Sequence, residues 1–484
     1  MKITISNLIY VETKNKKVLN DLQDILTKPN PEYHKLKALD KPVYNVSKDI
    51  EMWEDTPNGL AIPRGTGKLA RHIGRRHFDR VSSVTDNRTD GHEIDIDLHY
   101  KEGEFEGLFP YQQGLVDKFM STRQGVGVMP CGAGKTLSAL ALIAERKIST
   151  LVIVHTSELL EQWKDEILGN KEKKIEKKLL GDFSFGQFGC GKKKLGDLTI
   201  ATVQTLNNMK PLDFVKFNKQ FGQVILDEAH HCPARTFLET IQSFTCRYMY
   251  GLSATPKRKD RKEFALYSNI GPVIYEVKDK ELETAGRSVP VNVQYVNTGC
   301  EFDFKGMNED WTALTRAIAK HNGRNNTIIK NIDSDVESGR FPMVICHRKH
   351  HAIYLKQKLD AIGLRCGILI SDISKDKRQE YKRLALRHDL DVMVCMDKIA
   401  GEGLDIPAID TIHLVFPINN ESLLKQFSGR GRRKFDDKEF CLVYVYRDFL
   451  YRTRLSHKFE HKMGVKIYEN QRRWFRKWGF NVDA

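Results

Sequence analysis

The stretch VGVMPCGAGKTLSALALIA, from Val126 to Ala144, decides the fold of this chain. A short apolar strand runs there into a glycine-rich turn and then into an amphipathic helix. The glycines let backbone N–H groups close on an anion, Lys135 can neutralise terminal phosphate oxygens, and the Thr136 hydroxyl can hold Mg²⁺ at the helix N-terminus. The pattern therefore predicts a loop that binds nucleotide phosphates. The residues that form it are Gly132, Ala133, Gly134, Lys135 and Thr136.

Two comparisons show how specific this loop is. Met129 stands where the full P-loop pattern has glycine or alanine, yet GAGKT between a strand and a helix is much rarer by chance than a tight turn. The segment PRGTGK at residues 63–68 has a similar composition, but Leu69 occupies the position of the Mg²⁺-binding hydroxyl. No apolar strand leads into it either. We interpret this second segment as a turn.

The length and charge of the chain limit its class. At 484 residues it is longer than one hydrophobic core usually organises, which predicts about three domains. A net charge of +15 favours a polyanionic partner such as nucleic acid, although solubility alone would also explain it. No apolar run reaches the ~18 residues of a spanning helix, and the opening MKITISNLIYVET lacks the features of a signal peptide. We expect no membrane contact and a cytoplasmic location, which is the host cytoplasm if a phage encodes the chain.

The nine cysteines are odd in number and never spaced C-x-x-C, which indicates reduced thiols rather than disulfides. The run His230-His231-Cys232 has side chains of the metal-ligand type, but no second cluster with metal spacing accompanies it. We therefore predict no zinc site.

A second motif, VILDEAHH at residues 224–231, places two acids at the end of a buried strand. Parallel α/β sheets bind ligands at the carboxyl ends of their strands. We expect Asp227 to complete the Mg²⁺ shell begun by Thr136, and Glu228 to orient and deprotonate the attacking water. An Asp-Glu pair after a strand is more often a cap or a turn, but about ninety residues after a phosphate loop it becomes specific.

Apolar strands alternate with helical stretches from about residue 108 to 278, and again from 343 to 446. This alternation is typical of α/β layers built on parallel sheets. The lysine-rich insert at residues 171–194 is predicted as a solvated loop, and residues 3–11 as one strand. In the first region the predicted strands are 150–154, 198–202, 224–226 and 248–252. In the second they are 343–347, 366–370, 391–396, 411–416 and 440–446.

Four motifs taken together resemble those of a known family. They are GAGKT (132–136), DEAH (227–230), SAT (253–255) and QFSGRGRR (426–433), in the order found in superfamily 2 helicases and translocases. Further matching stretches are PYQ (110–112), HTSELLEQW (155–163) and ATVQTL (201–206). The likeness covers roughly residues 108–450. It is closer to the XPB, UvsW and type III restriction branch than to the DEAD-box RNA helicases.

The resemblance implies an α/β fold with two tandem RecA-like parallel-sheet domains, ATP bound between them, and Mg²⁺. It implies that Gln112 reads the adenine base, that Arg430 and Arg433 reach the γ-phosphate from across the cleft, and that Gln426 is a catalytic residue of the same motif. Two further nucleotide contacts that it implies are Gly403 and Asp405. The residues expected to couple nucleotide state to nucleic acid are Thr202, Gln204, His230, Ser253 and Thr255.

We expect five segments along the chain. They are an N-terminal accessory, DNA-binding domain (1–103), a RecA-like ATP-binding domain (104–280), a linker (281–320), a second RecA-like domain (321–450) and a basic aromatic tail (451–484). The cation-rich segment at residues 65–80 is either a DNA-facing surface or a solvated face. The tail suits either base stacking or an amphipathic helix that packs back on the second domain.

The expected function is ATP-dependent helicase or translocase activity on branched or forked duplex DNA, by a monomeric motor. Such activity would serve branch migration, recombination, repair or replication. Two alternatives within the superfamily are an RNA helicase and the motor subunit of a nuclease-linked translocase. A third is a non-enzymatic nucleic-acid clamp, against which the complete set of ATPase residues argues.

Overall fold

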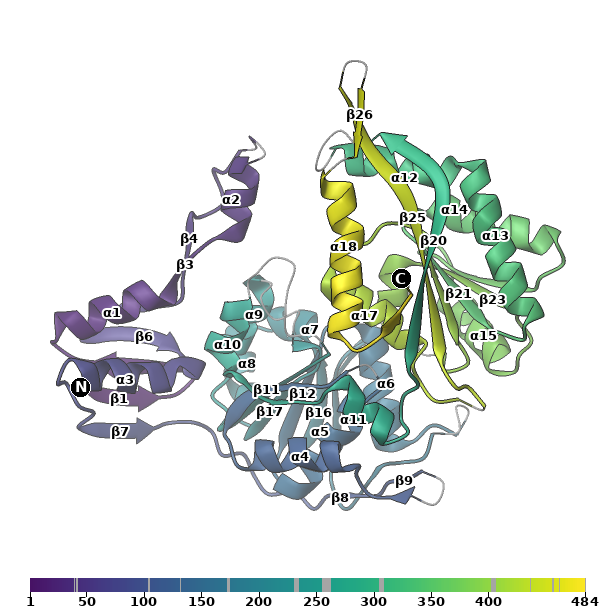
Figure 1. The fold of residues 1–484 in the computed structure, drawn as a ribbon. Coiled ribbons are helices and arrows are strands. Elements are labelled where there is room, and N and C mark those ends of the chain that lie inside the picture. Colours follow the sequence, from purple (N-terminus) through teal and green to yellow (C-terminus); the bar gives the residue numbers. More distant parts are fainter. Residues whose placement is uncertain are drawn as a thin grey trace. The chain divides into compact units, whose positions relative to one another are not determined.

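The computed structural model describes residues 1–38, 40, 42–102, 105–130, 132–171, 175–229, 235–254, 263–303, 309–401, 406–435, 437–454, 457–460 and 462–483. The chain divides into two compact units, Met1–Val277 and Lys278–Ala484. The first unit carries an N-terminal sheet and a larger sheet, and the second carries one large sheet (Figure 1). The predicted α/β class is confirmed, since the two large sheets consist almost wholly of parallel strands.

The N-terminal sheet has five strands in the order β5-β6-β2-β1-β7. The prediction of one strand over residues 3–11 is wrong, because Ser6 and Asn7 form a turn that separates two antiparallel strands. Helices α1 and α3 contribute Val18, Leu22 and Ile73 to its core. The elements of this N-terminal region are β1 (Lys2–Ile5), β2 (Leu8–Glu12), α1 (Lys16–Leu26), β3 (Thr27–Pro29), α2 (Pro31–Ala38), β4 (Asp49–Glu51), β5 (Glu54–Thr56), β6 (Gly59–Pro63), the 3₁₀ turn η1 (Arg64–Thr66), α3 (Gly67–Arg76) and β7 (Ser83–Asp86). Strands β3 and β4 pair with each other in a separate two-stranded sheet.

The larger sheet of the first unit has the order β15-β14-β16-β12-β17-β18-β11-β19. Its central strands β12, β16 and β17 are buried along their whole length, as expected of a parallel sheet covered on both faces. Its strands are β11 (Gln124–Val128), β12 (Thr150–Val154), β14 (Phe185–Gly189), β15 (Lys192–Lys194), β16 (Leu198–Thr202), β17 (Gln223–Leu226), β18 (Tyr248–Ser253) and β19 (Val273–Glu276). Its helices are α4 (Pro110–Met120), α5 (Lys135–Arg146), α6 (Ser157–Leu168), α7 (Val203–Asn207), α8 (Pro211–Asn218), α9 (Arg235–Gln242) and α10 (Glu263–Ile270). Short strands pair beside it: β8 (Asp97–Leu98) with β13 (Leu179–Leu180), and β9 (Lys101–Glu102) with β10 (Phe105–Glu106).

The lysine-rich insert is not simply the solvated loop that its composition predicted. Its strand β14 pairs in parallel with β16, and β15 adds an antiparallel edge strand. Phe188 of β14 is buried in the core of the sheet, whereas the three lysines of β15 are exposed. The many lysines of the insert obscured the apolar pattern of β14. The lysines of β15 suit an edge strand, because charged side chains discourage pairing with another chain.

The expectation that no apolar strand leads into residues 63–68 is wrong, because the buried strand β6 ends at Pro63. The N-terminal sheet is anchored to the larger sheet through η1, the 3₁₀ turn in this segment. Arg64 is buried there and donates from Nη2 to the carbonyl oxygens of Cys246 at 2.8 Å and Arg247 at 3.3 Å. Gly65 fits because a Cβ at this position would lie 2.5 Å from two carbonyl oxygens of α10. Cys246 and Arg247 lead into β18, so the N-terminal sheet holds the start of the strand that ends at Ser253.

The second unit is built on a sheet in the order β22-β23-β21-β24-β25-β20-β27, with β26 antiparallel to β25. Residues 281–320, predicted as a linker, contribute β20 to this sheet, because Val291 and Val293 alternate inward. Its strands are β20 (Val291–Asp303), β21 (Pro342–Cys346), β22 (Cys366–Leu369), β23 (Val392–Met396), β24 (Thr411–Leu414), β25 (Cys441–Arg454), β26 (His457–Glu460) and β27 (Asn481–Val482). Its helices are α11 (Asp279–Thr284), α12 (Glu309–Lys320), α13 (Asn322–Glu337), α14 (Lys349–Ala361), α15 (Lys375–Leu386), α16 (Asp397–Gly401), α17 (Glu421–Arg430) and α18 (Lys462–Lys477).

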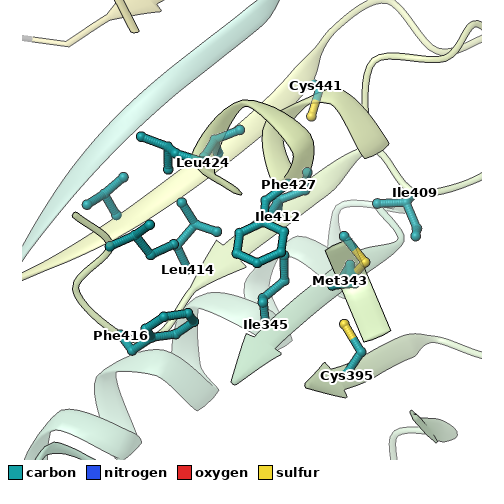
Figure 2. Packing of buried hydrophobic residues seen from close by; sticks show 14 of the residues in the cluster. Met343, Ile345, Cys395, Ile409, Ile412, Leu414, Phe416, Leu424, Phe427 and Cys441 are labelled. Atoms are coloured by element: carbon teal, nitrogen blue, oxygen red, sulfur yellow. The ribbon is translucent and has the colours of Figure 1, made fainter. Parts of the chain in front are cut away.

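One apolar core of the second unit lies between its sheet and α17, and another lies between the sheet and helices α13 and α14. Figure 2 shows Ile345, Ile412 and Leu414 of the strands gathered with Leu424 and Phe427 of the helix. All five side chains are almost completely buried. This packing fixes the orientation of α17, and the last turn of that helix begins the arginine motif.

The tail forms α18, which packs against β25 and α17. Phe475 is fully buried in the same core, and Trp474 and Trp478 pack at its edge. Arg473 and Arg476 are exposed on the helix. Of the two alternatives for the tail, the structure supports the packing helix for Phe475.

Within the described ranges, no helix is both long and apolar enough to cross a bilayer. The cysteines of the same ranges are free thiols, of which Cys190 is exposed and the others are buried.

Candidate nucleotide site and nucleic-acid coupling residues

The predicted phosphate loop lies between β11 and α5. Gly132 and Gly134 have φ angles of 82° and 79°, in the left-handed region that favours glycine, and Gly134 is the N-cap of α5. Lys135 and Thr136 begin the helix. The loop thus brings a helix N-terminus, a lysine and a hydroxyl to the carboxyl end of a strand, which is the arrangement that binds phosphate.

Gln112 braces this loop from α4. Its Nε2 donates to the carbonyl oxygen of Ala133 at 3.0 Å, and its Oε1 accepts from the backbone N–H of Phe109 at 3.1 Å. The side chain is buried, and a Cβ on Gly134 would lie 2.3 Å from Nε2. Gly134 is therefore required by close packing as well as by its φ angle. Contact of Gln112 with adenine stays a prediction.

Asp227 follows β17 at the same edge of the sheet and is held by two hydrogen bonds. Its Oδ2 accepts from Trp163 Nε1 at 2.8 Å, and its Oδ1 accepts from the backbone N–H of Glu228 at 2.9 Å. Burial and the neighbouring charge of Glu228 raise the pKa of Asp227, while Lys135 and the Trp163 hydrogen bond lower it. The carboxylate is thus positioned by a buried tryptophan of α6.

Glu228 connects this acid pair to the phosphate loop. Its Oε1 lies 3.6 Å from Lys135 Nζ. Strand β18 separates β17 from β11, so the two motifs start about 10 Å apart and their side chains meet over β18. Glu228 has a φ of 49°, a strained value for a residue with a side chain, and such strain is concentrated at functional sites.

The side chains at this edge suit a Mg²⁺–nucleotide complex. Mg²⁺ prefers a few oxygen ligands and keeps several waters, which Thr136 and Asp227 can satisfy without a larger cluster. Within the described ranges, no group of three or more His, Cys, Asp or Glu side chains forms a metal centre. The hydroxyl of Thr136 and the carboxylate of Asp227 therefore fit a magnesium ion that arrives with phosphate.

The described coupling residues lie at the same edge but differ in exposure. Thr202 is buried and caps α7, with its hydroxyl 2.8 Å from that of Thr205. Gln204 is exposed and donates to the His155 carbonyl oxygen at 3.0 Å. The carbonyl oxygen of Ser253 accepts from the N–H of Met129 at 2.9 Å, which joins the end of β18 to the start of the phosphate loop. Their contacts with nucleic acid stay predictions.

The arginine motif of the second unit lies at the end of α17. Gln426 and Arg430 belong to this helix, and Arg430 Nε donates to the carbonyl oxygen of Ala400 at 3.1 Å. Arg433 forms a backbone bridge with Ser288. Both predicted phosphate-contacting arginines are only partly buried.

Arg432, between them, has a different environment. It is buried and forms ion pairs with Asp279 and Glu283 of α11, the second at 2.8 Å between Nη2 and Oε1. Lys425 adds a third contact to Asp279 at 3.2 Å. Arg432 therefore attaches α11 to the helix that carries the motif. Four predicted site residues, His230, Thr255, Gly403 and Asp405, lie outside the described residues.

Two family models match the chain at these features. The model of the type III restriction enzyme res subunit matches residues 106–258, and the model of the helicase conserved C-terminal domain matches residues 323–434. The first match holds the phosphate loop and the acid pair, and the second holds the arginine motif. The chain belongs to superfamily 2 of the helicases. The resemblance predicted from the motifs is confirmed, and the two large parallel sheets match the tandem RecA-like domains of superfamily 2.

Among the curated relatives, one is named for DNA and another for RNA. The chain is 27% identical over 310 residues to the DNA 3'-5' helicase XPB of Kineococcus radiotolerans, with 62% of this chain and 52% of that protein covered. It is 25% identical over 418 residues to a protein of Acanthamoeba polyphaga mimivirus whose name proposes an ATP-dependent RNA helicase, with 83% and 73% covered. The chain spans about half the length of the XPB relative.

A solved structure agrees on the fold. A fragment assigned as the HsdR subunit of a type I restriction enzyme from Vibrio vulnificus aligns with a TM-score of 0.51 and 17% identity. The alignment covers 69% of this chain and 63% of that chain.

Trp163 is a site residue that sequence reasoning missed. Trp163 is the last residue of HTSELLEQW, a stretch that matches a family motif, and the motif predicts no role for this tryptophan. Trp163 is completely buried, and it donates to Asp227, which lies 64 positions away in the sequence. The sequence alone could have indicated that Trp163 matters. A tryptophan buried under a helix that covers a sheet needs an acceptor for its indole N–H. The identity of that partner could only come from the structure.

The substitution Trp163→Phe is expected to lower ATP hydrolysis at limiting Mg²⁺ by about 10- to 100-fold, because partners that orient a metal ligand have effects of this size. Excess Mg²⁺ should restore much of the rate, since the carboxylate remains. Hydrolysis measured as a function of Mg²⁺ concentration checks both statements.

The matched control is Trp53→Phe, which removes an indole N–H that donates to Thr27 Oγ1 at 3.0 Å in the N-terminal region. Its Mg²⁺ dependence should equal that of wild type. If Trp163→Phe also leaves the Mg²⁺ dependence unchanged, the hydrogen bond to Asp227 does not position a metal ligand.

Proposed function

We propose that this chain is an ATP-hydrolysing motor that moves along DNA as a helicase or translocase. The observation that carries the proposal is the grouping of Lys135 and Glu228, 3.6 Å apart, beside the buried Asp227. An ammonium, two carboxylates and a helix N-terminus form the set that phosphoryl transfer from ATP to water requires. The superfamily to which the chain belongs supports the same reaction.

Each residue has a proposed role in that reaction. The backbone of residues 132–136 binds the phosphates, and Lys135 neutralises their charge. Thr136 and Asp227 hold Mg²⁺, which supplies further charge neutralisation to the phosphate oxygens. Glu228 orients the attacking water and accepts its proton. Because phosphate competes with Glu228 for the ammonium of Lys135, nucleotide binding makes the carboxylate available to water.

The second unit is proposed to complete hydrolysis through Gln426, Arg430 and Arg433. The hydrogen bond from Arg430 Nε to Ala400 orients its guanidinium group, and an oriented arginine stabilises the charge that develops on a transferred phosphate. Hydrolysis would then depend on the conformational state of the two RecA-like domains, which converts chemistry into movement. We propose residues 104–280 and 321–450 as those domains.

DNA is the proposed track. The net charge of +15 supports binding to a polyanion, and the XPB relative is named as a DNA 3'-5' helicase. We extend both the DNA preference and the 3'-5' direction to this chain. Contacts from Gln204 and neighbouring residues are proposed to follow phosphates without reading bases.

The finer proposal is a branched or forked DNA substrate, recognised by residues 1–103. Its support is α3, which carries four exposed cations: Lys68, Arg71, Arg75 and Arg76. Removal of residues 1–103 would be a poor test, because it would expose the carbonyl oxygens that Arg64 now contacts. Charge substitutions on α3 avoid that problem.

An RNA helicase is the second candidate, because the mimivirus relative with RNA in its name matches 83% of this chain. A motor subunit of a nuclease-linked translocase is a third, because the family model of residues 106–258 comes from a restriction enzyme subunit. In that case another chain would supply the nuclease.

The deciding experiment measures ATP hydrolysis with single-stranded, duplex, forked and four-way DNA, and with the corresponding RNAs. We expect forked or four-way DNA to stimulate most. Nucleic-acid affinity should fall roughly 100-fold or more between 50 and 200 mM salt, because phosphate contacts dominate it. Stronger stimulation by RNA would replace the DNA assignment, and hydrolysis that no nucleic acid stimulates would contradict the motor.

A further inference from the structure

Phe78 follows helix α3 and points into solvent. Its exposed fraction is 95%, the highest among the large hydrophobic residues of the described ranges. It also has a φ of 56°, in the left-handed region that disfavours residues with a Cβ. The position just after the end of a helix commonly takes this conformation, and glycine is the usual residue there. A phenylalanine here contributes nothing to the core and strains the backbone.

The surrounding chain holds Phe78 in this conformation from both sides. His77 Nε2 is hydrogen-bonded to Asp21 Oδ2 at 2.7 Å, and the carbonyl oxygen of His77 accepts from Asn15 at 3.3 Å. On the other side, Asp79 pairs with the amino terminus of Met1 at 2.6 Å. Strain that is fixed by several independent contacts is a sign of function.

The helix that ends at Phe78 carries a cationic strip along one face. The strip consists of the exposed cations Lys68, Arg71, Arg75 and Arg76, and the exposed His72 lies among them. Their spacing of three and four residues places them together on the helix, opposite the buried residues Ala70, Ile73 and Gly74. The strip is about 12 Å long, which equals the rise of three to four base pairs along a DNA duplex axis at ~3.4 Å each. Asp21 is the acid that faces it, 3.6 Å from Arg76.

We propose that Phe78 stacks on a nucleobase exposed where a DNA duplex branches, while the cationic strip holds the adjoining phosphates. This inference rests on the proposed DNA motor function. It identifies Phe78 as the residue that contacts DNA at the branch. The occupant is a nucleic acid because the ring lies at the end of a strip of positive charge. Stacking on an aromatic ring accepts any base, which suits a motor that ignores sequence.

The test compares the affinity of wild type and Phe78→Gly for a forked DNA and for a linear duplex of equal length, at one salt concentration. Fork affinity should fall about tenfold, as expected when one base loses its stacking partner. Duplex affinity and duplex-stimulated ATP hydrolysis should stay within about twofold of wild type. The melting temperature should rise, because glycine relieves the left-handed strain.

Two variants serve as controls for the aromatic contact. Phe78→Trp should keep fork affinity, since it offers a larger stacking face. Tyr44→Gly removes another highly exposed aromatic ring, 93% exposed and in the segment between α2 and β4 rather than on α3, and should leave fork affinity unchanged. A fork affinity of Phe78→Gly equal to wild type would overturn the inference, as would a lowered melting temperature.

A further variant separates this inference from the function on which it rests. Arg71→Glu combined with Arg75→Glu should weaken binding to forked DNA through lost phosphate contacts. If this double variant loses fork preference while Phe78→Gly keeps it, the strip recognises DNA and the stacking contact is wrong. If wild-type protein itself shows no stimulation by DNA, the proposed function fails.

Discussion

Lys135→Ala is expected to reduce nucleic-acid-stimulated ATP hydrolysis to below about a tenth of the wild-type rate. The ammonium of Lys135 is the positive charge that the phosphate loop supplies to the terminal phosphates. The fold should persist, because Lys135 begins α5 at a partly exposed position and alanine favours a helix. Nucleic-acid affinity should change little, since it depends on many cations. Steady-state phosphate release and DNA binding measured on the same preparation check both parts.

Lys118→Ala is the matched control for this variant, because Lys118 is an exposed lysine of the neighbouring helix α4. It should hydrolyse ATP at the wild-type rate. Turnover of Lys135→Ala above about a tenth of wild type would remove this lysine from the phosphate site.

Glu228→Gln is expected to bind ATP and hold it, with hydrolysis slowed by about 100- to 10,000-fold. Asp227 keeps both of its hydrogen bonds, because one comes from Trp163 and the other from the backbone of residue 228. The amide replaces the carboxylate without a change in size, so the strained backbone need not move. What is lost is the base that accepts a proton from water. Retention of labelled ATP together with single-turnover hydrolysis measures the two effects separately.

Loss of nucleotide binding in Glu228→Gln would identify a different role. Glu228 would then be a metal ligand or a structural acid that holds Lys135. An unchanged hydrolysis rate would remove it from the reaction altogether.

The parts of the fold that were predictable are those with a local signal. The strand before the phosphate loop and the strand before Asp227 are short apolar runs that end in distinctive residues, and the structure has both as β11 and β17. Hydrophobic alternation also indicated the second unit. There the strand predicted to end at residue 446 continues to Arg454, because β20 and β26 pair with it along that length.

What the sequence could not provide depends on contacts between distant residues. Composition classified the lysine-rich insert as a loop, although pairing with β16 makes a strand of its apolar centre. The motif QFSGRGRR contains three arginines of equal appearance, and only the acids of α11 distinguish the buried Arg432 from Arg430 and Arg433. The partner of Asp227 was likewise invisible, since nothing local links it to Trp163.

Arg64 of η1 is buried against the residues that lead into β18, and this contact affects how the first unit unfolds when it is heated. Parting the N-terminal sheet from the larger sheet would leave this guanidinium group without the carbonyl oxygens of Cys246 and Arg247, and an unpaired buried charge is costly. The interface also contains Ala265 of α10 in the apolar core of the N-terminal sheet. The two sheets of the first unit should therefore unfold in one thermal transition. Calorimetry of the chain should show no separate transition for the N-terminal sheet.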